Sequence, residues 1–346
     1  MNRNPGTLGF AAPTFAGYSD THIDVPCLER IDFDLIRDSS LLAEKLGFGS
    51  VWFADHLMLG RDWEILEAWT VLSAIAAITS RIKIGSLVNN ALIRNPALFA
   101  KMTSTLDLVS KGRLIVGVGS GSIPTEMDAY GFRYPASIKD RVAFLDETIY
   151  ILKHLWAGKE LSHEGEFFQL RKAICTPSPV QKPHPPILIG TLSDSKLVHR
   201  SVARHANMYN TNGTIEQFKS RLSLLKDFCF QEHRQPSEIS TSIDAHVLIG
   251  KNEDAIKELK RKIATCSPNY PSVKWKSYQE SESMTWEDFE KFNFIGTAPQ
   301  ITEKLSEYMK AGCDFFTLWF LDLPSFEGMR LFAKEVMPNF NNETKR

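Results

Sequence analysis

Residues 82–118 read IKIGSLVNNALIRNPALFAKMTSTLDLVSKGRLIVGV, and this stretch carries the clearest sign of the fold. Two short runs rich in Val and Ile, Ile82–Val88 and Leu114–Val118, enclose the segment Pro96–Val109, whose apolar residues recur at helical spacing. This order of strand, helix and strand predicts a βαβ unit, in which the helix crosses between two parallel strands. Pro96 suits the first turn of the helix, because its missing N–H would have no partner inside the helix.

The same alternation extends outward from this unit over most of the chain. Eight runs are predicted as strands: Leu8–Ala12, Ser50–Ala54, Ile82–Val88, Leu114–Val118, Ile187–Ile189, Met208–Asn210, Ile243–Ile249 and Phe315–Phe320. Helical spacing occurs at Ile31–Leu46, Ile65–Ile78, Pro96–Val109, Arg141–Leu155, Lys196–His205, Ile215–Phe230, Asp254–Ala264, Pro299–Ala311 and Phe326–Val336. Eight parallel strands joined by helices can close into a barrel or lie open as a doubly wound sheet. Strand number and chain length favour an α/β fold of the (β/α)8 TIM barrel class, and Gly117–Ser122 lacks the third Gly of a dinucleotide-binding turn.

Two insertions interrupt the repeat within what we predict to be a single barrel domain of residues 1–346. The first, at about 158–186, ends in a proline-rich stretch that should enter the fifth strand as a stiff extended segment. The second, at about 266–294, holds several aromatic residues among charged ones. It either covers the barrel mouth or is a surface excursion, because long insertions tend to be functional or disordered.

The composition limits the classes of function. Of the 346 residues, 43% are hydrophobic, which allows a sizeable core and excludes a disordered chain. The 40 basic and 41 acidic residues leave a formal charge of -1, which provides no electrostatic footprint for nucleic acid or an anionic membrane. We therefore expect a small-molecule partner. The sequence shows neither an apolar leader nor an 18-residue uncharged apolar run, so we expect no signal peptide and no membrane-spanning helix.

The five cysteines predict reduced thiols. Cys27, Cys175, Cys229, Cys266 and Cys313 lie far apart in the sequence, form no C-x-x-C pair and are odd in number. These features argue against a disulfide framework and indicate a cytoplasmic protein.

A carboxylate and an imidazole follow the second predicted strand. Asp55 and His56 lie at its C-terminal end, which in a (β/α)8 barrel is the end that carries the active site. His is the side chain best suited to proton transfer near neutral pH. A structural alternative is that Asp55 caps the next turn and His56 packs against a neighbour. Glu126, after the fourth strand, can orient substrate, act as an acid or base, or form a surface ion pair.

Amide-bearing and small residues follow the third and fourth predicted strands. Asn89 and Asn90 can hydrogen-bond a heterocycle or stabilise a turn. The segment Gly117–Gly121 (GVGSG) lacks bulky side chains, so a flat ring or a second backbone segment can come close to it. Tight packing of a helix on the strand is the structural alternative.

The fifth predicted strand ends in Gly190 and Thr191 and leads into a helix. Backbone N–H groups and a hydroxyl at a helix N-terminus suit a phosphate group. Asp194 opposes that interpretation unless its side chain caps the helix and points away. The sequence contains no H-E-x-x-H motif and no paired Cys/His spacing, so we predict no metal site.

Eight short segments, taken in their order and spacing, resemble a known family. They are Ser50–His56 (SVWFADH), Leu66–Thr70 (LEAWT), Ile84–Val88 (IGSLV), Arg94–Ala97 (RNPA), Gly112–Leu114 (GRL), Gly117–Gly121 (GVGSG), Pro179–Pro183 (PVQKP) and Pro186–Gly190 (PILIG). The resemblance is to the luciferase-like monooxygenase family of flavin-dependent oxidoreductases, in particular its deazaflavin-dependent branch, and it spans most of the chain.

The resemblance implies a barrel that binds coenzyme F420, an 8-hydroxy-5-deazaflavin, across its strand ends and exchanges hydride at C5 of the ring. It also implies a non-proline cis peptide bond at Leu87–Val88 that supports the ring. The expected cofactor-binding residues are Asp55, Ser86, Leu87, Val88, Asn89, Gly119, Ser120, Gly190 and Thr191. The expected catalytic residues are His56, which would donate a proton or polarise the substrate, Asp55, which would orient His56, and Glu126. Relatives are commonly dimers or larger, so a homo-oligomer is expected.

Three other functions stay open at this point. An FMN-dependent monooxygenase of the same family would receive reduced flavin from a partner flavin reductase and react with oxygen. A barrel glycosidase would use two of Asp55, Glu126 and Asp244 as acid and as nucleophile or base. A barrel that binds flavin without catalysis is the third, because a fold does not establish an activity.

Overall fold

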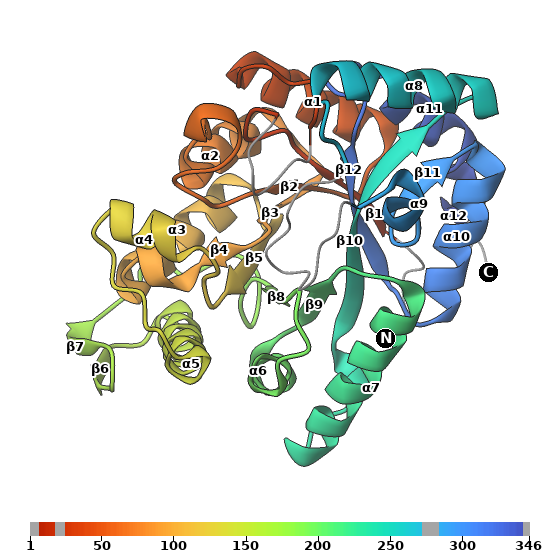
Figure 1. The fold of residues 1–346 in the computed structure, drawn as a ribbon. Helices are drawn as coiled ribbons and strands as arrows, with labels where there is room; N and C mark the ends of the chain where they lie inside the picture. The colour runs from red at the N-terminus through yellow and green to blue at the C-terminus, as the bar shows by residue number, and fades with distance from the viewer. Residues whose placement is uncertain (1–6, 18–24, 272–283, 342–346) are drawn as a thin grey trace.

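The computed structural model describes residues 7–17, 25–271 and 284–341. Ten strands form one sheet, in which β4 (Asn89–Asn90) and β11 (Phe294–Gly296) are short additions and the other eight close a barrel. In order around the barrel, these are β1 (Thr7–Ala11), β2 (Ser50–Phe53), β3 (Lys83–Ser86), β5 (Leu114–Gly119), β8 (Ile187–Gly190), β9 (Met208–Thr211), β10 (Ser240–Ile249) and β12 (Phe315–Phe320). All their pairings are parallel. The predicted (β/α)8 barrel is confirmed (Figure 1).

Helices surround the strands on the outside of the barrel (Figure 1). The longer ones are α1 (Phe33–Leu46), α2 (Ala68–Ile78), α3 (Pro96–Val109), α5 (Ile138–Trp156), α6 (Lys196–His205), α7 (Ile215–Gln231), α8 (Glu253–Cys266), α10 (Ala298–Lys310) and α11 (Glu327–Glu335). Local chemistry sets their ends. Asp32 caps the first turn of α1, and Gly47 ends that helix in the left-handed conformation with φ 92°. Pro96 opens α3 as predicted, with the Asn95 side chain as its cap.

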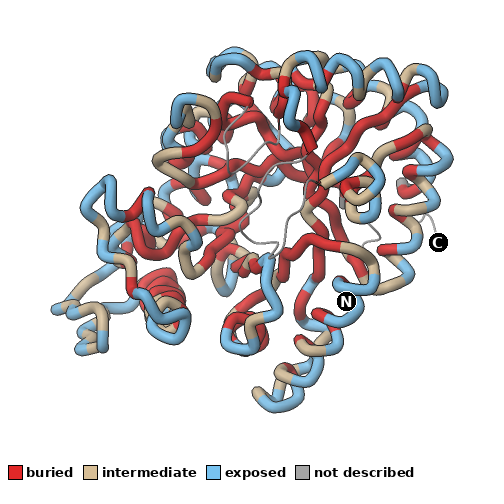
Figure 2. The backbone as a smooth tube through the Cα atoms, in the orientation of Figure 1, coloured by how far each residue is buried: buried red, intermediate tan, exposed pale blue. Residues whose placement is uncertain are grey.

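The main hydrophobic core fills the space between the strands and the helices. In Figure 2 the strands and the inner helix faces are buried, whereas the outer helix faces are exposed. Alternation along β12 shows how a strand divides its side chains: Phe316, Leu318 and Phe320 join this outer core, whereas Phe315 points into the barrel. The same alternation determines which residues of every barrel strand can reach the mouth.

The barrel interior is packed with apolar side chains beneath its mouth. The rings of Trp52 and Phe315 stack with their centroids 6.0 Å apart, and Ile115 and Leu188 belong to the same cluster. A Cβ at Gly85 would lie 2.6 Å from the Trp52 ring, so the indole requires glycine at that position. The barrel is therefore a filled core, and any ligand site lies above it at the strand ends.

Several boundaries differ from those expected from the sequence: β10 begins at Ser240 and α5 at Ile138, and two further differences have a clear cause. The run Ile82–Val88 ends early as β3, the Leu87–Val88 peptide bond is cis, and the chain then pairs again with β5 as β4. The helix expected at Ile65–Ile78 begins at Ala68, because the Glu67 side chain accepts hydrogen bonds from the N–H groups of the first turn.

The sequence patterns do not predict several short elements. They are α4 (Pro124–Ala129), the hairpin β6 (Leu161–Glu164) and β7 (Gln169–Ala173), α9 (Trp286–Glu290) and α12 (Pro338–Asn341). Each spans only four to six residues, too few to show a helical or strand period. The omission of α4 matters most, because it carries Glu126.

The two predicted insertions differ in what can be described. The first, at about 158–186, contains the β6–β7 hairpin. Within the second, at about 266–294, residues 272–283 lie outside the described residues. The prediction that this insertion covers the barrel mouth therefore concerns residues outside the described part of the chain. In its described part, Phe289 of α9 packs against Tyr270 in a cluster that also holds Leu248 and Leu321.

The prediction of five reduced thiols is wrong for two of them. Cys27, before α1, and Cys266, the last residue of α8, form a disulfide with their Cα atoms 5.1 Å apart. They are 239 residues apart in sequence, and barrel closure brings the N- and C-terminal repeats side by side, so spacing along the chain does not reveal the pair. Cys175, Cys229 and Cys313 are free and buried.

We expect Cys27→Ser to lower the free energy of unfolding by about 2–4 kcal/mol, because the bond restricts the unfolded chain. Urea unfolding of oxidised protein checks this value. Cys229→Ser is the control, because it replaces a buried cysteine that forms no disulfide. If wild type with and without a reductant unfolds at the same urea concentration, the bond makes no contribution.

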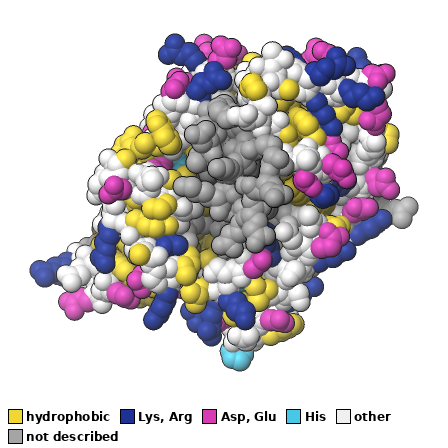
Figure 3. Space-filling model, in the orientation of Figure 1, with side chains coloured by type: hydrophobic (Ala, Val, Ile, Leu, Met, Phe, Trp, Pro, Cys, Tyr) yellow, Lys and Arg dark blue, Asp and Glu magenta, His cyan; other side chains and the backbone are white. Residues whose placement is uncertain are grey.

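Within the described ranges, no helix is both long and apolar enough to cross a membrane. On the face shown in Figure 3, Lys and Arg side chains are mixed with Asp and Glu side chains around the periphery. This mixture agrees with the formal net charge of -1.

Candidate active site

A histidine and a buried glutamate form a pair at the strand ends. His56 follows β2, and Glu126 lies in α4, after β5. The His56 Nδ1 atom lies 3.1 Å from Glu126 Oε2. Glu126 Oε1 accepts hydrogen bonds from the backbone N–H groups of Leu57 and Met58, which follow His56 directly. One carboxylate thus fixes both the imidazole and the loop that carries it.

The electrostatics of this pair favour a charged glutamate. Glu126 is 2% exposed, and burial alone would raise its pKa. The hydrogen bonds from His56, Leu57 and Met58 outweigh burial and lower the pKa of Glu126 overall. A charged Glu126 accepts the Nδ1 proton of His56, so proton exchange with a bound molecule would take place at Nε2, on the opposite side of the ring.

Asp55 is engaged in a different contact from the one expected. Its carboxylate is 1% exposed and receives two hydrogen bonds from Arg94, at 2.5 and 2.9 Å. Arg94 also contacts Glu67 at 2.8 Å, and the Asn90 N–H donates to Asp55. Burial raises the pKa of the Asp55 carboxyl, whereas Arg94 favours its charged form. The group that contacts His56 is Glu126, and Asp55 anchors the end of β2 to the loop after β4.

Sequence reasoning assigned no role to Arg94. Its segment, Arg94–Ala97, is among those that carry the family resemblance, but the partner of its guanidinium is 39 residues away in Asp55. A buried carboxylate at a strand end is the signal that could have prompted the search for such a cation.

The Leu87–Val88 peptide bond is cis, as the resemblance implies. The Val88 side chain fits against three glycines, Gly117, Gly119 and Gly190, which together we call the Val88 cradle. A Cβ at Gly119 would lie 2.7 Å from Val88 Cγ2, and one at Gly190 would lie 3.0 Å from Val88 Cγ1. A Cβ at Gly117 would collide with the Ser86 carbonyl oxygen. The cradle accepts no larger residue at these strand ends without rearrangement.

Ser86 and Asn89 hold the backbone of the cradle at Gly117. Both are 1% exposed, and the Asn89 amide donates to Ser86 Oγ and, at 2.6 Å, to the Gly117 carbonyl. Asn89 Oδ1 accepts from the Trp69 indole at 2.7 Å. Their polar atoms are therefore used within the protein. Ser120, directly after β5, is partly exposed.

The turn after β8 leaves backbone donors at a helix N-terminus. The Thr191 hydroxyl accepts from the Ser193 N–H at 3.2 Å, and the Thr191 N–H donates to the Asn210 carbonyl. Ser195, at the N-cap of α6, makes no side-chain cap hydrogen bond. The first N–H groups of α6 therefore lack a side-chain cap, an arrangement that an anion can complete.

A buried arginine neutralises the acidic residue in this turn. Arg221 of α7 is 5% exposed, and its Nε lies 2.7 Å from Asp194 Oδ1. It also donates to the carbonyls of Leu192 and Asn212 and to Thr211 Oγ1. Arg221 thereby holds the turns after β8 and β9 together and offsets the charge that argued against a phosphate. No sequence motif includes this residue.

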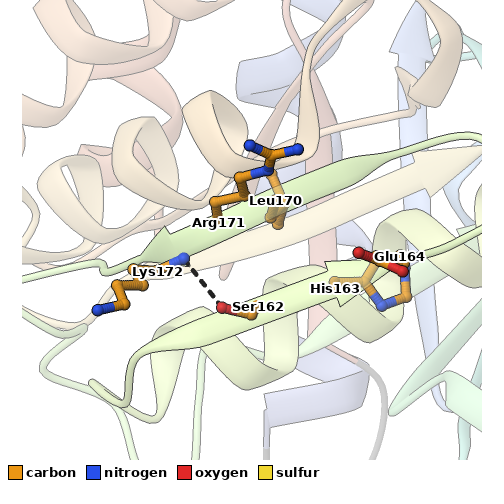
Figure 4. A pocket seen from close by; sticks show the side chains of 6 residues that line it. All are labelled: Ser162, His163, Glu164, Leu170, Arg171 and Lys172. Carbon is orange, nitrogen blue, oxygen red and sulfur yellow. Dashed lines mark hydrogen bonds between the residues drawn. The ribbon is translucent and has the colours of Figure 1, made fainter.

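The β6–β7 hairpin lies outside the barrel (Figure 1), and a separate depression lies on it (Figure 4). Its lining residues are Ser162, His163, Glu164, Leu170, Arg171 and Lys172. In Figure 4 the backbone N–H of Lys172 donates to Ser162 Oγ, at 3.1 Å. None of the residues expected at the active site lines it, so it is not a candidate for the chemistry at the strand ends.

The closed parallel barrel and the imidazole–carboxylate pair at its strand ends place the protein among the (β/α)8-barrel enzymes. Comparison with known families specifies this class further. The family model described as luciferase-like monooxygenase matches residues 8–314. The chain belongs to the luciferase-like monooxygenase family.

Individual relatives differ in cofactor. An F420-dependent glucose-6-phosphate dehydrogenase of Amycolatopsis mediterranei is 34% identical over 140 residues, which is 40% of this chain and 41% of that protein. An FMNH(2)-dependent dimethylsulfone monooxygenase of Pseudomonas putida is 24% identical over 324 residues, or 89% of this chain and 88% of that protein. The solved structure of the long-chain alkane monooxygenase LadA superposes with a TM-score of 0.80 at 19% identity, covering 98% of this chain and 91% of that one. The chain thus spans less than half of the first relative.

Proposed function

We propose that the protein is an F420-dependent oxidoreductase that transfers a hydride between the deazaflavin and a small organic substrate. The observation that carries this proposal is the His56–Glu126 pair together with the Val88 cradle, since His56 and Val88 follow the neighbouring strands β2 and β3. Interconversion of an alcohol and a carbonyl moves one hydride and one proton, and the pair can exchange the proton at His56 Nε2. The 34% identity to an F420-dependent relative supports the choice of cofactor.

The residues at the strand ends fit a flavin-type cofactor. A flat ring can rest on Val88, whose side chain is seated in the space that the missing Cβ atoms of Gly119 and Gly190 leave. A phosphate fits the turn from Gly190 to Ser195, where Arg221 offsets the charge of Asp194. When bound, the deazaflavin supplies hydride exchange at C5 of its ring. Asp55, Ser86 and Asn89 keep the cradle in place through the buried contacts described above.

An FMN-dependent monooxygenase is the second candidate. The relative from Pseudomonas putida matches 89% of the chain, whereas the F420-dependent relatives from Amycolatopsis mediterranei and Microbacterium testaceum match 40% and 65%. This candidate requires a flavin reductase as partner. The glycosidase alternative has no further support, because the family is one of oxidoreductases and because Asp55 and Glu126 are buried hydrogen-bond acceptors.

Titration of the purified protein with oxidised F420 and, separately, with FMN tests the two candidates. Absorbance and fluorescence report the binding of each. We expect selective binding of F420, followed by turnover when reduced or oxidised substrates are screened. Selective binding of FMN would favour the monooxygenase. F420 binding without turnover on any acceptor would favour the non-catalytic barrel.

Gly119→Ala should weaken F420 binding by about ten-fold or more, because overpacking of a tight site costs about 1–3 kcal/mol. The added methyl group would lie 2.7 Å from Val88 Cγ2 and would displace that side chain. The double variant Gly119→Ala/Val88→Ala restores space and should recover most of the affinity. Equal dissociation constants for wild type and Gly119→Ala, from the same fluorescence titration, would show that the cradle does not contact the cofactor.

The proposed assembly is a homodimer or larger oligomer. Its support in the structure is α3, which exposes Leu98, Leu108 and Val109 to solvent. Sedimentation of the full chain tests this proposal. The proposed compartment is the cytoplasm, which the three free cysteines support and the Cys27–Cys266 disulfide does not.

A further inference from the structure

The two sides of the barrel mouth differ in chemistry. On the side of β5 and β8, the inward positions at the strand ends are Gly117, Gly119 and Gly190 of the Val88 cradle, which carry no polar side chain. On the side of β9, β10 and β12, they carry Asn212, Asp244 and Thr317, which together we call the polar wall. β3 and β10 are four strands apart in a barrel of eight, so the wall faces the cradle across the mouth.

Strand register places the three residues of the wall at one level. Asp244 pairs with Thr317 in the register of β10 and β12. Two residues earlier on β10, Ser242 pairs with Asn210 of β9, and Ser242 Oγ accepts a hydrogen bond from the Asn210 side-chain amide at 2.8 Å. Asn212 lies two residues beyond Asn210, which puts it level with Asp244.

Alternation shows that these side chains point inward. Tyr209, Ile243 and Leu318 belong to the outer core between strands and helices. Phe315 and Met208, on the alternate positions, belong to the cluster inside the barrel. Thr317 is two positions from Phe315 and Asn212 is four positions from Met208, so both side chains point inward. Asp244 pairs with Thr317 on the neighbouring strand and points the same way.

Two atoms of the wall are buried without a hydrogen-bond partner among the described residues. They are Thr317 Oγ1, in a residue with no exposed surface, and Asn212 Oδ1, in a residue that is 9% exposed. Buried polar atoms are normally paired, because leaving one unpaired costs about 1–3 kcal/mol. Asp244 beside them accepts a hydrogen bond from the Trp319 indole at 2.8 Å. Thr317 Oγ1 and Asn212 Oδ1 therefore offer acceptor oxygens to a ligand.

We propose that the polar wall binds the substrate and selects an uncharged or cationic compound that bears hydroxyl or amine groups, in preference to a phosphate ester. Hydroxyl and ammonium groups donate to the carboxylate of Asp244 and the amide oxygen of Asn212. A phosphate would meet like charge at Asp244. Lys83, the first residue of β3, is an inward position at the end of the barrel away from the mouth, and none of the inward positions described at the C-terminal strand ends carries Lys or Arg. This inference rests on the proposed function. It assigns this chain a different substrate class from glucose 6-phosphate, the sugar phosphate that the name of its relative gives.

Calorimetry with three probes on the protein loaded with oxidised F420 tests the selection. The probes are 1-amino-2-propanol, 1,2-propanediol and glucose 6-phosphate. We expect wild type to bind the first two at least about ten-fold more tightly than the phosphate ester. Asp244→Asn should weaken the amino alcohol by about ten-fold or more and leave the phosphate ester unchanged or bound more tightly. Thr317→Val should weaken the diol. Asp254→Asn, on the exposed side of α8, is the control and should change none of the three affinities.

The affinity for F420, measured first for every variant, keeps the two proposals distinguishable. It should stay within about two-fold of wild type, because hydrogen bonds to the wall would belong to the substrate alone. If Asp244→Asn instead weakens F420, the wall belongs to the cofactor site and the inference is overturned. Preferred binding of glucose 6-phosphate also overturns it. If F420 does not bind at all, the proposed function fails, and the same calorimetry without cofactor still tests the preference for a donor over an anion.

Discussion

His56→Ala is expected to lower turnover by about 10²- to 10⁴-fold, the range that a positioned acid or base contributes. The affinity for F420 should change little, because the cradle and the turn after β8 provide the expected cofactor contacts. Added imidazole should restore part of the turnover if His56 acts through its ring nitrogen. Steady-state kinetics and the fluorescence titration, carried out on the same preparation, separate the two effects. Unchanged turnover would remove His56 from the mechanism.

Glu126 is expected to act through His56 as a positioning residue. Glu126→Ala removes the acceptor of the His56 Nδ1 proton and of two backbone N–H groups, so turnover should fall by about 10²-fold or more. Glu126→Gln keeps an acceptor oxygen in the same place and should retain more activity than Glu126→Ala. In the double variant His56→Ala/Glu126→Ala, the second change should add little to the first, because both act through one ring. Independent losses would contradict the pairing.

Arg94→Met is expected to lower the free energy of unfolding by about 3–5 kcal/mol, because it leaves the buried Asp55 carboxylate without its cation. Urea unfolding at neutral pH measures the loss. Arg200→Met provides the matched control, since Arg200 pairs with Glu232 at the surface and should cost about 1 kcal/mol or less. A similar cost for the two variants would mean that the buried ion pair has no special role.

The pH dependence of Arg94→Met follows from the pKa of Asp55. Burial already raises that pKa above its ordinary value, and loss of Arg94 removes the group that opposes the rise. A carboxyl whose pKa is higher in the folded than in the unfolded state binds protons more readily when folded, so lowering the pH through the folded value stabilises the fold. The deficit relative to wild type should therefore shrink as the pH falls from 7 towards about 4. The double variant Asp55→Asn/Arg94→Met should lose less stability than Arg94→Met at neutral pH.

Local patterns were sufficient to predict the barrel. The runs at Leu114–Val118 and Phe315–Phe320 correspond to β5 and β12, because a buried parallel strand is a nearly continuous apolar run. Helix ends also followed from short-range chemistry, as Pro96 shows at the start of α3. Elements of four to six residues, such as α4, lacked enough length to show any period.

The candidate site could be located from the sequence but not assembled. The rule that active sites lie at strand ends selected Asp55, His56 and Glu126. It did not show that Glu126, 70 residues away, contacts His56, nor that Asp55 is committed to Arg94. Such partners depend on how strand register and loop paths bring distant side chains together, and neither is written in a local pattern. Arg221 was missed for the same reason.

The bond between Cys27 and Cys266 has a consequence for fragmentation of the chain. With it, residues 27–266 form a covalent ring from which the N-terminal segment and the C-terminal repeats extend as two tails. A single protease cut at the exposed Glu166, in the turn between β6 and β7, would open the ring and leave one connected molecule. On a denaturing gel, the nicked protein should separate into two fragments only after a reducing agent is added.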